Sequence, residues 1–217
     1  MFPLSDVTRR PLTTPIVTIG IIAINIVVFF LELSQGDAFV IAWSVKPAEI
    51  AAGQSWPTLI TAMFMHGGFM HIIGNMVFLW VFGPEMEDAL GHVRYAVFYL
   101  VGGMLAWMVQ IAADPTSTVP ALGASGAIAA VMGAFLVTYP RDRIRTVLIF
   151  GIFVTVRMIP AIFLIGFWFL IQLLSAGATI GAAPDQAGGV AYMAHVGGLI
   201  FGAVTGRLFA IGRPRYS

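Results

Sequence analysis

The 217-residue chain contains no cysteine and few charged residues. The absence of cysteine excludes disulfide bonds, thiolate metal sites and a cysteine nucleophile. Only 10% of the residues are charged, against about a quarter in a typical soluble domain. Hydrophobic residues make up 59% of the chain, and the mean hydropathy is +0.93. This composition predicts a membrane protein with several spans, and the formal net charge of +1 argues against a nucleic-acid partner.

Six apolar segments are candidates to cross a bilayer, which needs about 20 apolar residues per helix. We therefore predict an all-α polytopic membrane bundle that forms a single domain over residues 1–217, with a short cytoplasmic segment at residues 1–15. The six spans are expected at residues 16–33, 58–82, 93–112, 122–139, 158–174 and 190–211.

The stretches between and at the ends of these spans give four further expectations. Residues 34–57 are too polar to span and rich in tryptophan, so we expect a folded loop on or partly in the membrane. Gly83-Pro84 is expected to end the second span. Residues 144–157 are apolar but short and are bracketed by arginines, which predicts an interfacial or re-entrant segment whose role stays open. A Gly-rich loop is expected at residues 175–189.

The basic residues favour one orientation of the six spans. An even number of spans places both termini on the same side of the membrane. With both termini cytoplasmic, ten of the eleven Lys and Arg residues fall in cytoplasmic segments, and only Lys46 lies outside.

Four polar residues stand out within the predicted spans: His71, Asn75, Ser125 and His195. Polar and ionisable groups are costly in hydrocarbon and usually mark function or a specific packing partner. His71 and Asn75 are four residues apart and therefore share one helix face. In the six-span topology all four residues lie at a similar depth, near the outer side of the membrane.

This set of residues permits acyl transfer. A serine hydroxyl needs a base to become nucleophilic, and His195 is the candidate base for Ser125. No carboxylate lies at a matching depth, so we predict a Ser-His dyad rather than a triad. His71 and Asn75 can donate hydrogen bonds to the oxyanion, together with the backbone N–H of Ser125.

Other interpretations of the same residues stay open. The small residues around Ser125 are typical of helix packing, and His66 fits equally well as a structural residue that anchors a loop. Histidines at one depth can bind a metal, but their spacing does not match a helical zinc site, so we expect no metal and no cofactor. A small transporter with a proton-relay histidine pair is a further possibility, although it leaves the placement of Gly123-Ala124-Ser125-Gly126 unexplained.

Three motifs, each on the expected span, resemble those of the rhomboid intramembrane serine proteases. The family has Gly-x-Ser-Gly in the fourth span, His-x-x-x-Asn after another histidine in the second, and Ala-His before a glycine-spaced face in the sixth. These motifs appear here as Gly123-Ala124-Ser125-Gly126, as His66 with His71 and Asn75, and as Ala194-His195 with Gly198 and Gly202.

The resemblance implies an intramembrane serine endopeptidase that cleaves single-span membrane proteins in or near their transmembrane segments. By that resemblance Ser125 is the nucleophile, His195 is the general base, and His71 and Asn75 belong to the oxyanion site. The resemblance further implies that five residues have structural or packing roles near the site: His66, Gly123, Gly126, Gly198 and Gly202. The resemblance also implies a bacterial inner-membrane protein whose partners are transmembrane substrates and lipids. The alternative is a family member that binds transmembrane clients without cleaving them.

Overall fold

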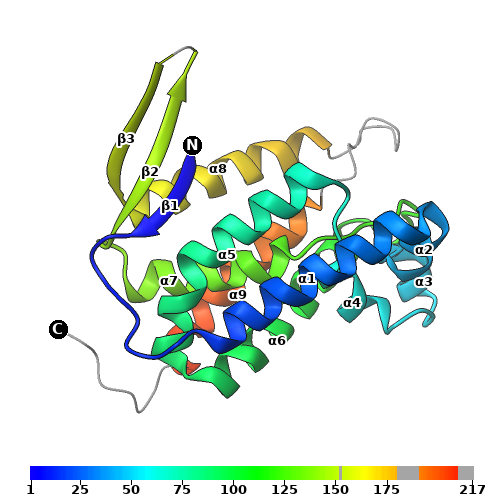
Figure 1. Cartoon of the computed structure of the whole chain (residues 1–217). Helices are drawn as coiled ribbons and strands as arrows, with labels where there is room; N and C mark the ends of the chain where they lie inside the picture. Colours follow the sequence, from blue (N-terminus) through cyan, green and yellow to red (C-terminus); the bar gives the residue numbers. More distant parts are fainter. Residues whose placement is uncertain (152, 180–190, 210–217) are drawn as a thin grey trace.

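The computed structural model describes residues 1–151, 153–179 and 191–209, which form a helical bundle with a small antiparallel sheet at one end (Figure 1). The strands are β1 (Phe2–Asp6), β2 (Arg143–Phe150) and β3 (Phe153–Pro160). The helices are α1 (Ile16–Gln35), α2 (Asp37–Trp43), α3 (Pro47–Ala51), α4 (Thr58–Thr61), the 3₁₀ turn η1 (Ala62–Phe64), α5 (Phe69–Leu90), α6 (His92–Ala113), α7 (Ser125–Thr138), α8 (Ala161–Thr179) and α9 (Tyr192–Phe209).

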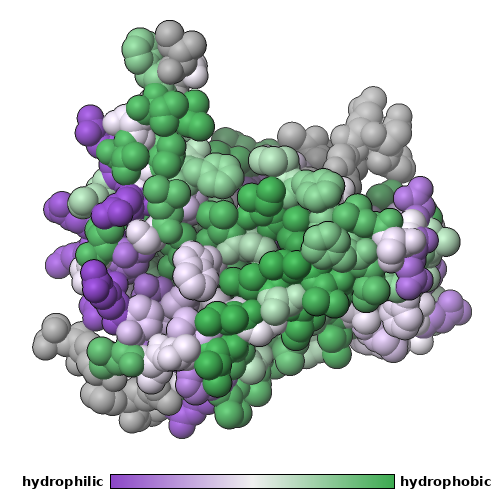
Figure 2. Space-filling view, viewed as in Figure 1, coloured by the Kyte–Doolittle hydropathy of each residue, from purple (hydrophilic) through white to green (hydrophobic). Residues whose placement is uncertain are grey.

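Three of these helices, α1, α5 and α6, are long and apolar enough to cross a membrane, and α7 and α8 are shorter apolar helices. Figure 2 shows hydrophobic side chains over the middle of this face of the molecule and hydrophilic side chains towards its two ends. The six-span arrangement itself stays a prediction. Residues 180–190 and 210–211, which belong to the predicted outer loop and to the ends of the sixth span, lie outside the described residues.

Helix α7 lies at the centre of the bundle. Although it has only 14 residues, residues 126–135 are all buried, and it contacts α5, α6, α8 and α9. A helix that is apolar on every side belongs in the interior of a protein. The first residue of this buried helix is Ser125.

Helices α7 and α9 touch through their backbones. A Cβ added to Gly202 would collide with the carbonyl of Ala130, and one added to Gly198 would collide with the carbonyl of Gly126. Small residues let membrane helices approach this closely. Gly198 and Gly202, which the sequence assigns to a packing face, therefore lie at the contact between these two helices.

Helix α5 begins and ends later than the predicted second span. Gly68 has φ +153°, where glycine is favoured, and the turn there separates His66 from the helix that carries His71. At the other end α5 continues to Leu90, so the expectation that Gly83-Pro84 ends this helix is wrong.

Within the acidic stretch after Pro84, Glu87 has partners on two other helices. The fully buried Glu87 accepts hydrogen bonds from the backbone N–H groups of Val17 and Thr18, at 2.9 and 2.8 Å, and lies 2.6 Å from Nδ1 of His92. The first N–H groups of a helix have no intrahelical partner and favour a negative charge. Glu87 thus caps α1, a tertiary contact that hydropathy does not reveal.

The expected loop at residues 34–57 contains the short helices α2 and α3. Val45 and Ala121 exchange two backbone hydrogen bonds of 2.9 and 2.8 Å, which attach this loop to the segment that precedes α7. Lys46 lies 2.7 Å from Glu49, and the hydrogen bond from its ammonium group holds the pKa of the Glu49 carboxyl below its usual value. The loop is therefore joined to the chain close to Ser125.

The segment expected to be interfacial or re-entrant forms the hairpin of β2 and β3, and β1 pairs with β2 to give the strand order β1-β2-β3. The prediction of an all-α chain is therefore wrong at this end of the molecule, where the N-terminal segment also supplies a strand. An apolar run of this length carries no periodicity that separates a strand from a buried helix. Its Val, Ile, Thr and Phe residues favour the strand.

Candidate active site

Ser125 and His195 form a hydrogen-bonded pair between α7 and α9. Oγ of Ser125 lies 2.6 Å from Nε2 of His195. When Nε2 carries no proton, the hydroxyl donates to it, which is the arrangement that general-base activation of a serine requires. The backbone contact between α7 and α9 brings the two residues within this distance.

His195 has a second partner, Gln172 on α8, which sequence reasoning missed. Oε1 of Gln172 lies 2.7 Å from Nδ1 of His195, and the two residues are only 8% and 7% exposed. An amide oxygen accepts but cannot donate, so Nδ1 carries the proton and Nε2 is left to accept the hydrogen bond from Ser125. The available signal was that Gln172 is the only strongly polar residue between positions 161 and 174.

Helix α8 also contributes an aromatic side chain, Trp168, that packs beside His195. The ring centroid of Trp168 lies 5.5 Å from that of His195. On the other helix, α9, the ring of Tyr192 meets the imidazole edge-on at 6.2 Å. Trp168 and Gln172 are four residues apart and share one face of α8. This single helix face therefore holds the imidazole by both packing and hydrogen bonding.

A cavity of about 580 Å³ opens beside Ser125. Its lining includes His71, Asn75, Phe78, Trp168 and His195. The four residues that the sequence analysis placed at one depth thus meet around a single space.

Two side chains from α5 offer donors to this cavity. Nδ2 of Asn75 is buried and has no hydrogen-bond partner among the described residues. Nδ1 of His71 accepts a 3.3 Å hydrogen bond from the backbone N–H of Gly67, so a neutral His71 carries its proton on Nε2. Both donors suit a negatively charged oxygen at this position.

Gly123 separates His71 from Ser125. A Cβ added at Gly123 would lie 3.0 Å from Nε2 of His71 and 3.5 Å from Oγ of Ser125, and the φ of +137° is itself unfavourable for other residues. The backbone N–H of Gly123 donates to the carbonyl of Ala62 at 2.9 Å, which fixes the approach to α7. A glycine is therefore required beside the nucleophile.

His66 lies next to the site but does not line the cavity. Its ring centroid is 5.1 Å from that of His71, and its backbone N–H lies 3.1 Å from each carboxylate oxygen of Glu32 on α1. Both ring nitrogens of His66 are buried and lack a hydrogen-bond partner within the described ranges. Across the same described ranges, no group of three or more His, Cys, Asp or Glu side chains is arranged to hold a metal ion.

Comparison of the sequence with known protein families identifies the family of this chain. The family model of the rhomboid domain matches residues 52–211, which include every residue of the candidate site except Glu32. The chain belongs to the rhomboid family. Together with its long apolar helices, this membership identifies an integral membrane protein.

Three relatives illustrate the range of this rhomboid family. The chain is 29% identical over 205 residues to rhomboid protease GluP of Bacillus subtilis, which covers 93% of this chain and 36% of the relative. It is 30% identical over 158 residues to the chloroplastic rhomboid-like protein 11 of Arabidopsis thaliana, an alignment that covers 69% of this chain and 51% of the relative. It is 29% identical over 188 residues to the mitochondrial presenilin-associated rhomboid-like protein of Bos taurus, and here the alignment covers 84% of this chain and 46% of the relative. The chain thus spans between about a third and a half of the length of these relatives.

Proposed function

We propose that this rhomboid is an intramembrane serine endopeptidase that cleaves single-span membrane proteins in or near their transmembrane segments. The observation that carries the proposal is the 2.6 Å hydrogen bond between Ser125 and His195 at the edge of a cavity of about 580 Å³. A relative named as a rhomboid protease supports the same activity.

The proposed reaction begins with attack by Oγ of Ser125 on the scissile carbonyl carbon, while Nε2 of His195 accepts the hydroxyl proton. The imidazolium then gives this proton to the leaving amine as the C–N bond breaks, and an acyl-enzyme remains. Water attacks the ester carbonyl as His195 takes its proton, and Ser125 leaves and recovers a proton from His195. Gln172 accepts the Nδ1–H bond throughout, so it orients the ring and stabilises its positive charge.

In this proposal the oxyanion lies between α5 and α7. Asn75 and His71 are its side-chain donors, and the backbone N–H of Ser125 is the third. The first N–H groups of α7 have no intrahelical partner, and the positive end of the helix dipole also favours negative charge there. The unpartnered Nδ2 of Asn75 supports this assignment because an oxyanion would satisfy it.

We also propose that both termini are cytoplasmic, in a bacterial inner membrane. The distribution of basic residues supports this orientation. Substrates would be transmembrane proteins, and they would enter the cavity from the membrane.

A fluorophosphonate probe tests the proposed nucleophile. We expect the probe to label Ser125 in the membrane-embedded protein, as located by mass spectrometry of the digested product. His195→Ala should lower the labelling rate by at least about 100-fold, because general-base catalysis contributes about 10²–10⁴-fold. An unchanged labelling rate in His195→Ala would exclude His195 as the base. A folded wild-type protein that resists the probe would favour the client-binding alternative.

Replacing Gln172 tests the third member of the site. Leucine has a similar size but cannot accept the Nδ1–H bond, so Gln172→Leu should lower kcat about 10- to 100-fold, the effect of losing one hydrogen bond to a charged group. KM should change little, since Gln172 is not among the residues that line the cavity. Steady-state cleavage of a transmembrane reporter in proteoliposomes measures both constants.

Gln172→Glu is the matched control, because it keeps an acceptor oxygen at the same position. We expect this variant to cleave faster than Gln172→Leu. Burial of the introduced carboxylate should lower the melting temperature of this variant, so circular dichroism at the assay temperature is the check that both variants are folded. Wild-type kcat in a folded Gln172→Leu protein would contradict the positioning role.

A further inference from the structure

The β2–β3 hairpin combines an exposed apolar tip with an arginine-rich base. At the tip, Phe153, Val154 and Ile149 are 73%, 66% and 60% exposed. At the base, Arg145 lies opposite Met158 and Arg157 lies opposite Thr146 in the register of the two strands. Successive pairs point to opposite faces of a hairpin, so each face carries an arginine. Neither the proposed reaction nor the helix packing uses these side chains.

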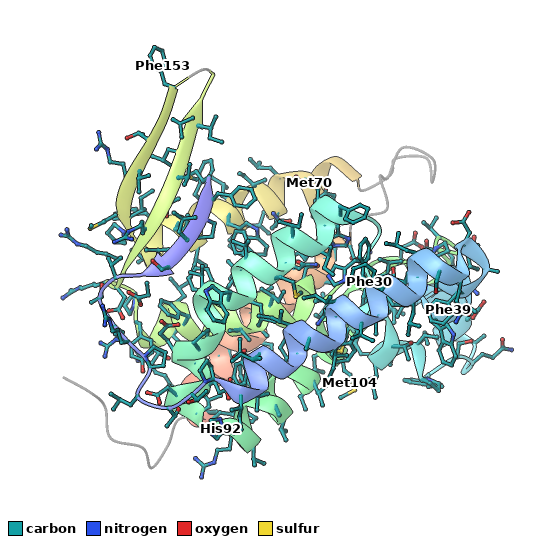
Figure 3. The ribbon with its side chains drawn as sticks, viewed as in Figure 1. Phe30, Phe39, Met70, His92, Met104 and Phe153 are labelled. Carbon is teal, nitrogen blue, oxygen red and sulfur yellow. The ribbon has the colours of Figure 1, made fainter. Side chains whose placement is uncertain are left out.

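The hairpin tip extends beyond the helices. Figure 3 shows Phe153 at the far end of the hairpin, pointing away from the bundle. In Figure 2 hydrophobic side chains cover the hairpin, and hydrophilic side chains gather along the edge of the molecule from which it rises. Strand β1 pairs with β2 only up to Val147, so among the described residues no third strand lies beside the segment nearer the tip.

We infer that this hairpin is a lipid-binding element, which inserts its tip into the membrane interface beside the bundle and binds anionic phospholipid headgroups through its arginines. Apolar side chains next to basic ones are typical of segments that lie in the interface and are attracted to an anionic leaflet. The guanidinium group also matches phosphate oxygens in a bidentate geometry.

Backbone hydrogen bonding limits the depth of insertion. The order β1-β2-β3 leaves the outer edge of β3 unpaired within the described chain. Free N–H and C=O groups are not tolerated in the hydrocarbon core, where water cannot reach them. The tip therefore lies among the headgroups and the first methylene groups of the lipid chains, where water still satisfies the edge.

The same free edge could instead pair with a second copy of the chain. The arginines oppose this arrangement, because two hairpins that approach each other bring together charges of the same sign. Anionic headgroups supply the opposite charge, and a bilayer already surrounds the bundle. Lipid is therefore the partner of the hairpin that complements both its apolar tip and the arginines at its base.

The absence of cysteine allows a direct test by site-specific labelling. In Val154→Cys, a bimane fluorophore reports the tip while Phe153 is kept. The protein is placed in phosphatidylcholine vesicles with or without phosphatidylglycerol, and nitroxide lipids quench any label that enters the bilayer. Labels at Leu170, exposed on α8, and at Thr118, exposed in the loop before α7, serve as the lipid-facing and water-facing controls.

We expect quenching at position 154 to approach that at position 170 in the anionic vesicles and to exceed that at position 118. The double substitution of Arg145 and Arg157 by glutamine should lower the ratio of inserted to free hairpin roughly 30-fold, the effect of losing two arginine contacts with an anionic surface. Quenching at position 170 should stay unchanged, which shows that the bundle remains inserted.

Three results would overturn the inference. The first is quenching at position 154 no stronger than at position 118. The second is the same insertion in vesicles without phosphatidylglycerol, which would exclude the headgroup contacts. The third is energy transfer between labelled copies without quenching by lipid, which would identify a second chain as the partner.

Discussion

Ser125→Ala is expected to abolish cleavage of a transmembrane reporter while leaving the protein folded in the membrane. The substitution removes the nucleophilic oxygen and its 2.6 Å hydrogen bond to His195 but adds no volume. Alanine is also the best helix former, so the start of α7 should persist. Serine proteases that lose their nucleophile lose about 10⁶-fold in kcat, which places the variant below detection in most assays.

The assay is the appearance of reporter fragments in proteoliposomes, with thermal unfolding as the check on folding. Ser34→Ala is a matched control, because Ser34 is exposed at the far end of α1 and its hydroxyl donates a hydrogen bond to the backbone carbonyl of Leu31 on the same helix. The control should cleave at the wild-type rate. Cleavage that survives in Ser125→Ala would exclude Ser125 as nucleophile. Binding of a transmembrane client without cleavage by the wild type would support the non-proteolytic alternative.

Gly202→Val is expected to have the largest effect on stability. A Cβ at this position meets the backbone of Ala130 and lies 2.9 Å from the backbone nitrogen of Ala134. A backbone cannot rotate away as a side chain can, so α9 must separate from α7. Inserting extra methylene groups into a packed core costs about 1–3 kcal/mol, and valine brings three carbons into a space that holds none, so we expect a loss of at least about 3 kcal/mol.

The matched control is Gly166→Val on α8, where an added Cβ meets nothing within 4 Å. Its unfolding should be close to that of the wild type, since valine at this position faces open space. Unfolding of both variants in detergent, followed by circular dichroism, measures the difference. Gly202→Val should also lose cleavage, because a displaced α9 carries His195 away from Ser125. Equal stability of the two variants would contradict the backbone contact.

Much of the candidate site could be predicted because polar residues are rare in apolar segments. Against such a background, Ser125, His71, Asn75 and His195 are conspicuous, and the prediction of six spans places them at a common depth. Gln172 escaped notice although it stands in an equally apolar segment. A carboxylate is the usual partner that orients a catalytic histidine, but a buried amide can orient an imidazole without the cost of burying a charge.

The parts of the fold that the sequence did not predict depend on contacts between distant segments. Hydropathy marks Gly83-Pro84 and the acids after it as the end of a helix, but Glu87 finds its partners on α1 and the helix continues. The apolar run that forms the hairpin has no periodicity that separates a strand from a helix, and its pairing with the distant β1 completes the sheet. Neither contact leaves a periodic pattern in the sequence.

The pairing of β1 with β2 also constrains the order in which the chain assembles. Phe2 is synthesised well before its partner Val147, which is made only after α1 to α7. Contacts between residues so distant in sequence form slowly, because the intervening chain must be brought together first. Closure of this sheet is therefore a late event in biogenesis, because β1 has to wait for β2, which is synthesised after seven helices.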